Sequence, residues 1–452
     1  MGAGVCDSSR SVSPTTMKTP SLKRDLGRWD LTAIGINMVI GAGIFLVPSE
    51  VAAQVGTWSP ALYLLLGLFS IVVGLCFAEV GSRFEGTGGP YLYTHAAFGR
   101  FAAFEVGWMY WFTRVAAQAS VTNGLVLALG FYWPSIATGW ARVLIITFVT
   151  AALAAVNVRG VRQAAWVVNF FTVGKLLPLL VFIGVGLFFI RPRLLAPVHP
   201  IPWGHVPAAM LLLLFIFSGY EVIAVPAGES KDPRRHVPFA VVTTILVITV
   251  INTLVHIVAM GTLTDLAQTT TPLADAALVF MGAAGALMIG VGTVTSITGN
   301  TAGQILTSSR MLFALAEHGD LPPFLAKIHR SYRTPANAVL FTSAAALALA
   351  LSGSFAELAA ASAMARLIVY LSVCGSTLAL RRRRFESVVK PATFRIPFGW
   401  ALPVLAIVLS ASILFGVSKD QFLVGMLALT VGAGLFLAAL RVGRNPGNTP
   451  LQ

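Results

Sequence analysis

Charged side chains are scarce in this chain. They make up 11% of its 452 residues, whereas hydrophobic residues make up 56% and the mean hydropathy is +0.82. A soluble protein of this length carries about a quarter charged residues. The composition therefore excludes a soluble globular protein and predicts an integral membrane protein.

Cysteine is rare as well, and acidic residues are fewer than basic ones. The three cysteines, Cys6, Cys76 and Cys374, fit no metal-ligand spacing, and two of them lie in hydrophobic runs, so we expect no disulfide framework. The net charge of +14 comes from basic residues dispersed among short loops. That dispersal fits the positive-inside rule better than a nucleic-acid surface.

Motifs of energy-driven pumps and membrane proteases are also missing. The sequence contains no Walker loop, no His-Glu-x-x-His and no Cys-x-x-Cys, and nothing in it suggests a catalytic triad. We therefore expect no catalytic residue, no metal and no cofactor.

Twelve hydrophobic runs are long enough to cross a bilayer as helices. If both chain ends lie on one side, that side holds most of the Lys and Arg, including the run 381–384, which we expect to be a solvated anchor. The opposite side holds only Arg142, Arg191, Arg193 and Lys419. This asymmetry predicts cytoplasmic termini and an even number of spans in the cytoplasmic membrane. The expected spans are 31–53, 60–80, 102–129, 140–156, 164–190, 206–227, 238–260, 278–305, 336–351, 357–380, 398–417 and 421–440.

The first run is weakest in its middle, where Gly41 and Gly43 flank Ala42 and Pro48 follows. Glycine lowers helix stability, and a break at membrane depth is tolerable only where the freed backbone groups line a cavity and meet a ligand. The pattern predicts a substrate site made of backbone. The alternative is close packing of helices through small residues.

The sixth run repeats this feature with Phe217-Ser218-Gly219-Tyr220-Glu221, followed by Pro226. The two broken runs stand five spans apart, and because five is odd, the second set of five spans is inverted relative to the first. Paired broken spans in inverted halves point to the central site of a transporter. We therefore expect a disordered cytoplasmic tail over 1–28, an inverted-repeat core over 29–382, two further spans over 383–441 and a cytoplasmic tail over 442–452.

Three motifs follow one another along the chain. They are Gly35–Phe45, then Phe217–Glu221 with Glu229–Arg235, and finally Ser309–Ala316 with Gly319–Pro322 and Arg333–Pro335. Together with the layout of the spans, these motifs resemble the amino acid/polyamine/organocation transporter superfamily from about residue 25 to 440. The resemblance implies an all-α membrane protein of twelve transmembrane helices with a LeuT-type fold of five plus five inverted spans. It also implies that helices 1 and 6 break at mid-membrane, that access alternates, and that substrates are amino acids and related amines.

The same resemblance implies which residues bind substrate. In that family the substrate carboxylate binds N–H groups of the broken first span, and the amine meets carbonyls of the first and sixth. A half-helix that begins at the break also presents a positive dipole end to an anion. Carried over, the carboxylate binders are Gly41, Ala42, Gly43 and Ile44, and the amine acceptors are carbonyls at Ile40, Phe217 and Ser218. The rest of the second break is expected to bind substrate as well, namely Gly219, Tyr220 and Glu221.

Lys175 lies deep in the fifth run, where a lone cation is costly and is usually functional or paired. Many proton-coupled or sodium-independent members of the superfamily place a lysine on this span. The resemblance implies that its ammonium stands in for a sodium ion and contacts backbone of the first span. A desolvated lysine can also exchange a proton. The alternative is a lysine that extends to the membrane surface.

Glu221 follows the second break directly. In one exchanger of the superfamily a glutamate at the equivalent place senses protons, and a carboxylate in a water-lined cavity can also bind an amine. Glu221 thus favours a substrate with a cationic side chain, or a role in proton binding. The positive charge of Arg114 nearby would offset the negative charge of Glu221. The alternative is a structural ion pair between Glu221 and Arg114.

Other polar and aromatic residues are candidates for substrate binding or gating, and for each a purely structural role is the alternative. Thr113 and Gln118 are expected to bind substrate or else to form hydrogen bonds between helices. Phe215 and Tyr220 are candidate gates, although aromatic residues in spans mostly serve packing. Weaker candidates are Asn300, Ser296, Arg366 and Tyr370.

Taken together, the sequence predicts a secondary active transporter, or permease, for amino acids. We expect it to be sodium-independent and coupled either to protons or to exchange of a second amino acid. A channel, a transporter-like sensor and an amine or polyamine exchanger stay open as alternatives. The expected partners are the substrate, a proton or counter-substrate, and membrane lipid. The loop 131–138 lacks the cysteine that bonds subunits of the superfamily to an accessory protein, so no disulfide-linked subunit is expected.

Overall fold

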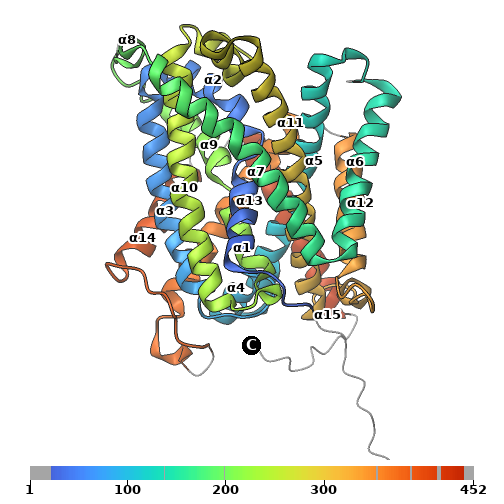
Figure 1. Ribbon diagram of the computed structural model, residues 1–452. Helices are drawn as coiled ribbons and strands as arrows, with labels where there is room; N and C mark the ends of the chain where they lie inside the picture. The colour runs from blue at the N-terminus through green and yellow to red at the C-terminus, as the bar shows by residue number, and fades with distance from the viewer. Residues whose placement is uncertain are drawn as a thin grey trace, which may run out of the picture.

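The computed structural model describes residues 22–441 except 137, 198, 353–354, 387–388 and 415–418. Its long helices lie side by side and run roughly along one direction (Figure 1). The described residues contain no strand beyond a single bridge between Leu26 and Ser230. The α-helices are α1 Arg28–Val39, α2 Gly43–Val55, α3 Ser59–Gly81, α4 Pro90–Phe98, α5 Arg100–Tyr132, α6 Gly139–Arg159, α7 Val161–Gly186, α8 Pro192–Leu195, α9 Val206–Phe217, α10 Pro233–Thr262, α11 Pro272–Glu317, α12 Ala336–Ser352, α13 Phe355–Ala379, α14 Ala401–Leu414 and α15 Lys419–Arg441. Short 3-10 helices are η1 Gly56–Trp58, η2 Pro134–Ile136, η3 Leu187–Phe189, η4 Tyr220–Glu229, η5 Leu266–Gln268, η6 Pro323–Ala326 and η7 Arg383–Phe385.

Among the described residues, most of each predicted hydrophobic run is helical, and the first and sixth runs are each divided between two helices. Among the described residues, six helical stretches are long and apolar enough to cross a membrane, and four shorter apolar helices accompany them. Large apolar side chains such as Trp140, Phe148 and Phe188 are exposed on the outer helices, as in a protein whose surface faces lipid. The chain is a multi-pass, all-helical membrane protein. The six stretches are Gly43–Gly81, Gly139–Arg159, Val161–Phe189, Val206–Glu229, Pro233–Thr262 and Pro272–Glu317.

Two helix ends meet near the middle of the molecule. Helix α1 ends at Val39 before α2 begins at Gly43, and α9 ends at Phe217 before η4 begins at Tyr220. Gly219 lies between α9 and η4 with a φ of 131°, a conformation that favours glycine. A Cβ placed on Gly219 would lie 2.7 Å from the carbonyl carbon and oxygen of Met38. The two interruptions therefore contact each other through backbone.

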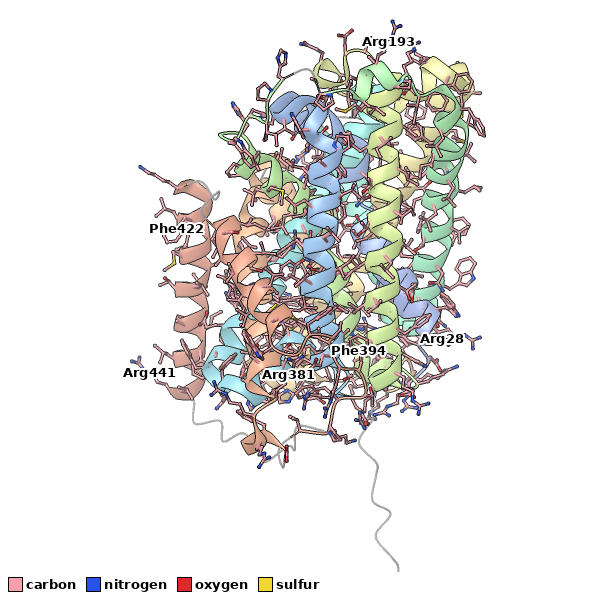
Figure 2. The ribbon with its side chains drawn as sticks, turned by 90° about the vertical axis from the view of Figure 1, so that its left-hand side faces the viewer. Arg28, Arg193, Arg381, Phe394, Phe422 and Arg441 are labelled. Carbon is pink, nitrogen blue, oxygen red and sulfur yellow. The ribbon has the colours of Figure 1, made fainter. Side chains whose placement is uncertain are left out.

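Basic side chains mark the two ends of the helices (Figure 2). Arg28 at the start of α1 and Arg441 at the end of α15 lie at one end together with Arg381, whereas Arg193 lies at the other. The two ends of the described chain thus lie on the same side of the molecule.

The expectation that Arg381 is solvated is wrong. Its guanidinium pairs with Glu79 of α3, with Nε 2.7 Å from Oε1 and Nη2 2.5 Å from Oε2. Glu79 is buried and also accepts a hydrogen bond from the Ile396 N–H, so it needs a cation to compensate its charge. The hydrogen bonds raise the pKa of Arg381 above its usual value. Arg382 and Arg383 are exposed, whereas the side chain of Arg384 is outside the described ones.

Candidate functional site

A small cavity lies where the α1–α2 junction, α5, the end of α9, α11 and α13 come together. Its volume is about 30 Å³, whereas ligand pockets span roughly 300–1,000 Å³. The cavity is therefore too small in this structure for a ligand of amino-acid size, and it must expand before such a ligand can bind. The lining residues are Met38, Val39, Gly41, Ala42, Gly43, Arg114, Ala117, Val121, Phe215, Ile216, Ser218, Asn300, Gln304 and Arg366.

The structure brings part of the predicted site to this cavity. Gly41, Ala42, Gly43, Phe215 and Ser218 are among its lining residues. The other candidates are not among them; these are Ile40, Ile44, Phe217, Gly219, Tyr220, Glu221, Thr113, Gln118 and Lys175.

Free backbone donors are found just after the end of α1. The Gly41 N–H donates to the Val39 carbonyl at 2.9 Å, so it is already used. The N–H groups of Ala42, Gly43 and Ile44 form no hydrogen bond with the described residues. The first N–H groups of a helix have no partner within it, and here they carry the positive end of the α2 dipole. Such an arrangement suits a carboxylate.

Lys175 secures the carbonyls on the other side of the same junction. Its side chain is fully buried, and Nζ donates to the carbonyls of Asn37 at 3.0 Å, Ile40 at 2.5 Å and Ser296 at 3.2 Å. The Ser296 hydroxyl also donates to the Ile40 carbonyl at 3.0 Å. Both lone pairs of that carbonyl are thus occupied, which leaves no place on it for a substrate amine. The carbonyls of Phe217 and Ser218 accept no hydrogen bond from the described residues.

Asn300 of α11 holds the end of α1 in the same way. Its Nδ2 donates to the carbonyls of Met38 at 3.0 Å and Asn37 at 3.2 Å, and its Oδ1 accepts from Gln304 at 3.4 Å. Asn300 was only a weak candidate and Gln304 was missed. The signal for Gln304 was its place one helical turn after Asn300, on the same face of the helix.

Glu221 lies behind the cavity, where it forms an ion pair with Arg114. Arg366 places Nε 3.4 Å from the same carboxylate oxygen. The second oxygen accepts from the Gly219 N–H at 2.8 Å and from the Tyr370 hydroxyl at 3.1 Å. Four groups from two helices, α5 and α13, and the α9–η4 junction therefore surround this carboxylate. Glu221 is 1% exposed and is not among the lining residues of the cavity.

Three of the remaining candidates, Thr113, Gln118 and Tyr220, are buried and do not line the cavity. The Thr113 hydroxyl and both amide atoms of Gln118 have no hydrogen-bond partner among the described residues. Tyr220 stacks on Tyr370 with ring centroids 5.9 Å apart. Phe215 alone of the two candidate gates lines the cavity.

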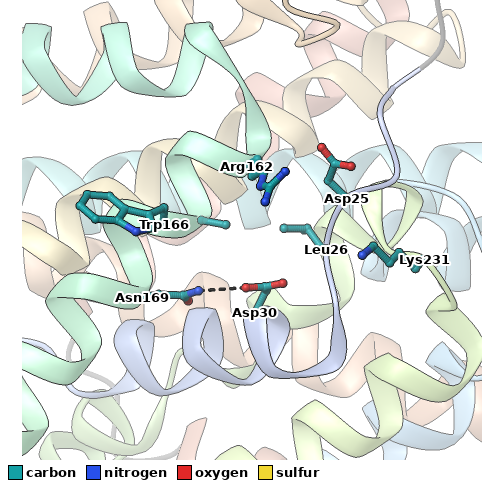
Figure 3. A pocket seen from close by; sticks show the side chains of 8 residues that line it. Asp25, Leu26, Asp30, Arg162, Trp166, Asn169 and Lys231 are labelled. Atoms are coloured by element: carbon teal, nitrogen blue, oxygen red, sulfur yellow. Dashed lines mark hydrogen bonds between the residues drawn. The ribbon is translucent and has the colours of Figure 1, made fainter.

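A larger cavity of about 300 Å³ lies at the end of the molecule where α1 and α7 begin (Figure 3). It is lined by charged residues of both signs, none of which was predicted to bind substrate. Asn169 Nδ2 donates to Asp30 Oδ1 at 2.9 Å across this cavity. This bond ties the base of α1 to α7. The lining residues are Asp25, Leu26, Asp30, Arg162, Ala165, Trp166, Asn169 and Lys231.

Comparison with known sequences adds independent evidence. A family model described as "Amino acid permease" matches residues 26–435. The serine/threonine exchanger SteT of Bacillus subtilis (strain 168) is 30% identical over 402 residues, which cover 85% of this chain and 89% of that protein. The methylthioribose transporter of the same organism is 28% identical over 411 residues, covering 86% and 87%. Its branched-chain amino acid permease BcaP is 26% identical over 419 residues, covering 88% and 89%.

Proposed function

Because this chain belongs to the amino acid permease family, whose members are transporters and not enzymes, we propose that it moves amino acids across the cytoplasmic membrane by alternating access. The serine/threonine exchanger and the branched-chain permease among its relatives are named for amino acids. Similarity extends over most of each chain, which supports a common mode of action.

The proposed architecture is a LeuT-type core of five plus five inverted spans, with α14 and α15 outside it. Its support is the pair of interruptions, after Val39 and after Phe217, which contact each other through Gly219. Helix α14 packs on α13 and α3, and α15 packs on α5 and α13, so both lie at the periphery. Twelve spans with both termini in the cytoplasm fit the two chain ends that lie on one side (Figure 2).

The observation that carries the proposed site is the row of free N–H groups on Ala42, Gly43 and Ile44. In the proposed mechanism these groups bind the substrate carboxylate, since every amino acid carries one. The amine then meets the carbonyls of Phe217 and Ser218, of which Ser218 lines the cavity. Ile40 drops out of the proposed amine site because Lys175 and Ser296 occupy its carbonyl.

Lys175 supports a sodium-independent cycle. Its ammonium contacts carbonyls at the end of α1 and on α11, where a bound cation would otherwise be needed to hold these backbones together. Coupling then comes from protons or from exchange of a second amino acid. Rigid-body motion of the interrupted helices against the rest alternates access to the site.

The test is uptake into proteoliposomes that contain the purified protein. A panel of labelled amino acids is offered with and without a pH gradient, with and without sodium, and with unlabelled amino acid inside. We expect saturable uptake that does not require sodium and that is raised by the pH gradient or by internal substrate. Binding without uptake or exchange would identify a sensor, uptake without saturation a channel, and uptake of polyamines alone an amine exchanger. Each of these outcomes contradicts the proposal.

A further inference from the structure

The charged groups that line the central cavity are both positive. Arg114 of α5 and Arg366 of α13 line it, and their side chains are 2% and 4% exposed. No carboxylate is among the described residues of the lining. Glu221 contacts both guanidinium groups but stands behind them. A ligand in the cavity therefore meets the arginines and not the glutamate.

The charges of this cluster do not balance. Two guanidinium groups share one carboxylate, which leaves a net charge of +1 in a region that is almost wholly buried. The Nε atoms of Arg114 and Arg366 have no hydrogen-bond partner among the described residues. Both arginines thus retain donor capacity beside the cavity.

Other buried charges nearby do not supply the missing anion. Arg310 and Glu229 form their own pair, with Nε 2.7 Å from Oε1, and both are fully buried. Lys175 is directed at three backbone carbonyls. It adds a further positive charge on the side of the cavity where α1 ends.

A buried, uncompensated charge is costly, and a ligand that brings the opposite charge removes that cost. A neutral amino acid uses its single carboxylate at the N–H groups of Ala42 to Ile44 and leaves the arginines as they are. A cationic side chain would add a second positive charge. An acidic side chain neutralises the cluster and occupies the free donors of two arginines, which bind carboxylates in strong charge-assisted hydrogen bonds.

On the basis of the proposed transport function, we propose that the substrate is an amino acid with an acidic side chain, of the aspartate or glutamate type. Its side-chain carboxylate binds Arg114 and Arg366. This reverses the expectation from Glu221 alone, which favoured a cationic side chain, because Glu221 is consumed by the arginines.

The first experiment measures competition in the proteoliposome uptake assay. Aspartate, glutamate, serine, leucine, arginine and lysine compete, each unlabelled, for the best labelled substrate. We expect an acidic amino acid to compete at lower concentration than any neutral or cationic one, by at least about tenfold. Equal or better competition by neutral or cationic amino acids overturns the acidic class while leaving transport itself in place. If no amino acid is taken up, the proposed function fails instead.

The second experiment changes the charge of the cluster in steps. Arg366→Gln leaves one arginine and one glutamate, so the net charge falls to zero, and we expect the acidic preference to fall at least about tenfold in favour of neutral amino acids. Adding Glu221→Gln to this variant restores the charge of +1 through Arg114, and the acidic preference should return. Arg235→Gln, a change at an 82% exposed arginine, is the control for loss of a positive charge elsewhere.

The double variant decides the matter. If the cluster serves only to stabilise the structure, the double variant should lose more transport activity than Arg366→Gln alone. The order in which amino acids compete should then be the same in both variants and in the unaltered protein. If Arg366→Gln does not change that order, or if the double variant fails to restore it while still transporting, the inference is wrong. Where either variant transports nothing, the competition series on the unaltered protein decides by itself.

Discussion

Gly219 offers the sharpest test of how the two interrupted helices fit together. A Cβ on Gly219 would lie 2.7 Å from the carbonyl carbon and oxygen of Met38 and 2.9 Å from the nitrogen of Val39. These are backbone atoms of the last turn of α1, so no side chain can rotate away to relieve the contact. Asn300 fixes the Met38 carbonyl, and Lys175 holds the same turn. The substitution Gly219→Ala must therefore push α1 and η4 apart.

The expected cost has two parts. A non-glycine residue at a φ of 131° adds roughly 1–3 kcal/mol of backbone strain. Overpacking of a well-packed region adds about 1–3 kcal/mol more. The sum of roughly 2–6 kcal/mol is a large part of the ~5–15 kcal/mol by which folded proteins are usually stable.

Substitutions at two other glycines distinguish the cost of backbone strain from the cost of the close contact. Gly56 has a φ of 56° and no neighbouring atom within 4 Å of an added Cβ, so Gly56→Ala carries strain without the contact. Gly434 lies in α15 with open space around it and without such a φ, so Gly434→Ala should be close to neutral.

The assay is thermal unfolding of the three purified variants in one detergent, followed by tryptophan fluorescence, with uptake measured on the same preparations. We expect Gly434→Ala to be the most stable of the three variants, Gly56→Ala to be less stable, and Gly219→Ala to be the least stable. Only Gly219→Ala should lose uptake. If Gly219→Ala is as stable as Gly56→Ala, the close backbone contact between the two interruptions does not exist.

Three further predictions follow from single contacts. Lys175→Ala removes the donor to the end of α1, so uptake should fall and lose its pH dependence; unchanged uptake and pH dependence would leave Lys175 a structural role only. Arg310→Gln leaves Glu229 buried and unpaired, which should cost about 3–5 kcal/mol in thermal unfolding, whereas adding Glu229→Gln should recover most of it; a double variant no better than the single one contradicts this. The hydrogen bond from Lys390 lowers the pKa of Glu85, so its contribution is present above the pKa of an unfolded glutamate and is lost as pH falls through the lowered value. Glu85→Gln should thus flatten the acid side of the stability profile by no more than about 1 kcal/mol, because the pair is exposed, and a larger change between pH 7 and pH 4 would refute it.

Local features of the sequence carry much of the fold. Hydrophobic runs are local, and among the described residues most of each run is helical, because a backbone in lipid must satisfy its own hydrogen bonds. Helix ends next to Gly41 and Gly219 follow from residues that weaken or interrupt a helix where they stand. The buried lysine on α7 is also visible as a lone cation in an apolar run.

The contacts between helices could not be obtained in this way. Gly41, Gly43 and Gly219 look alike in the sequence, yet only Gly219 has a positive φ and meets backbone closely. Arg381 looks like a surface anchor until Glu79 of α3 is found beside it. One sequence does not show which helix faces which.

By its sequence alone, then, this chain is determined to be a helical membrane protein with two weak points in its spans, since hydrophobicity and helix propensity act over neighbouring residues. The tertiary structure decides which backbone groups at those weak points stay free and which are taken by Lys175 and Ser296. It also decides that two arginines, from α5 and α13, enclose Glu221 and face the cavity in its place. The net charge of this buried site is set by groups that lie more than a hundred residues from one another in the sequence, and only the packing of the helices brings them together.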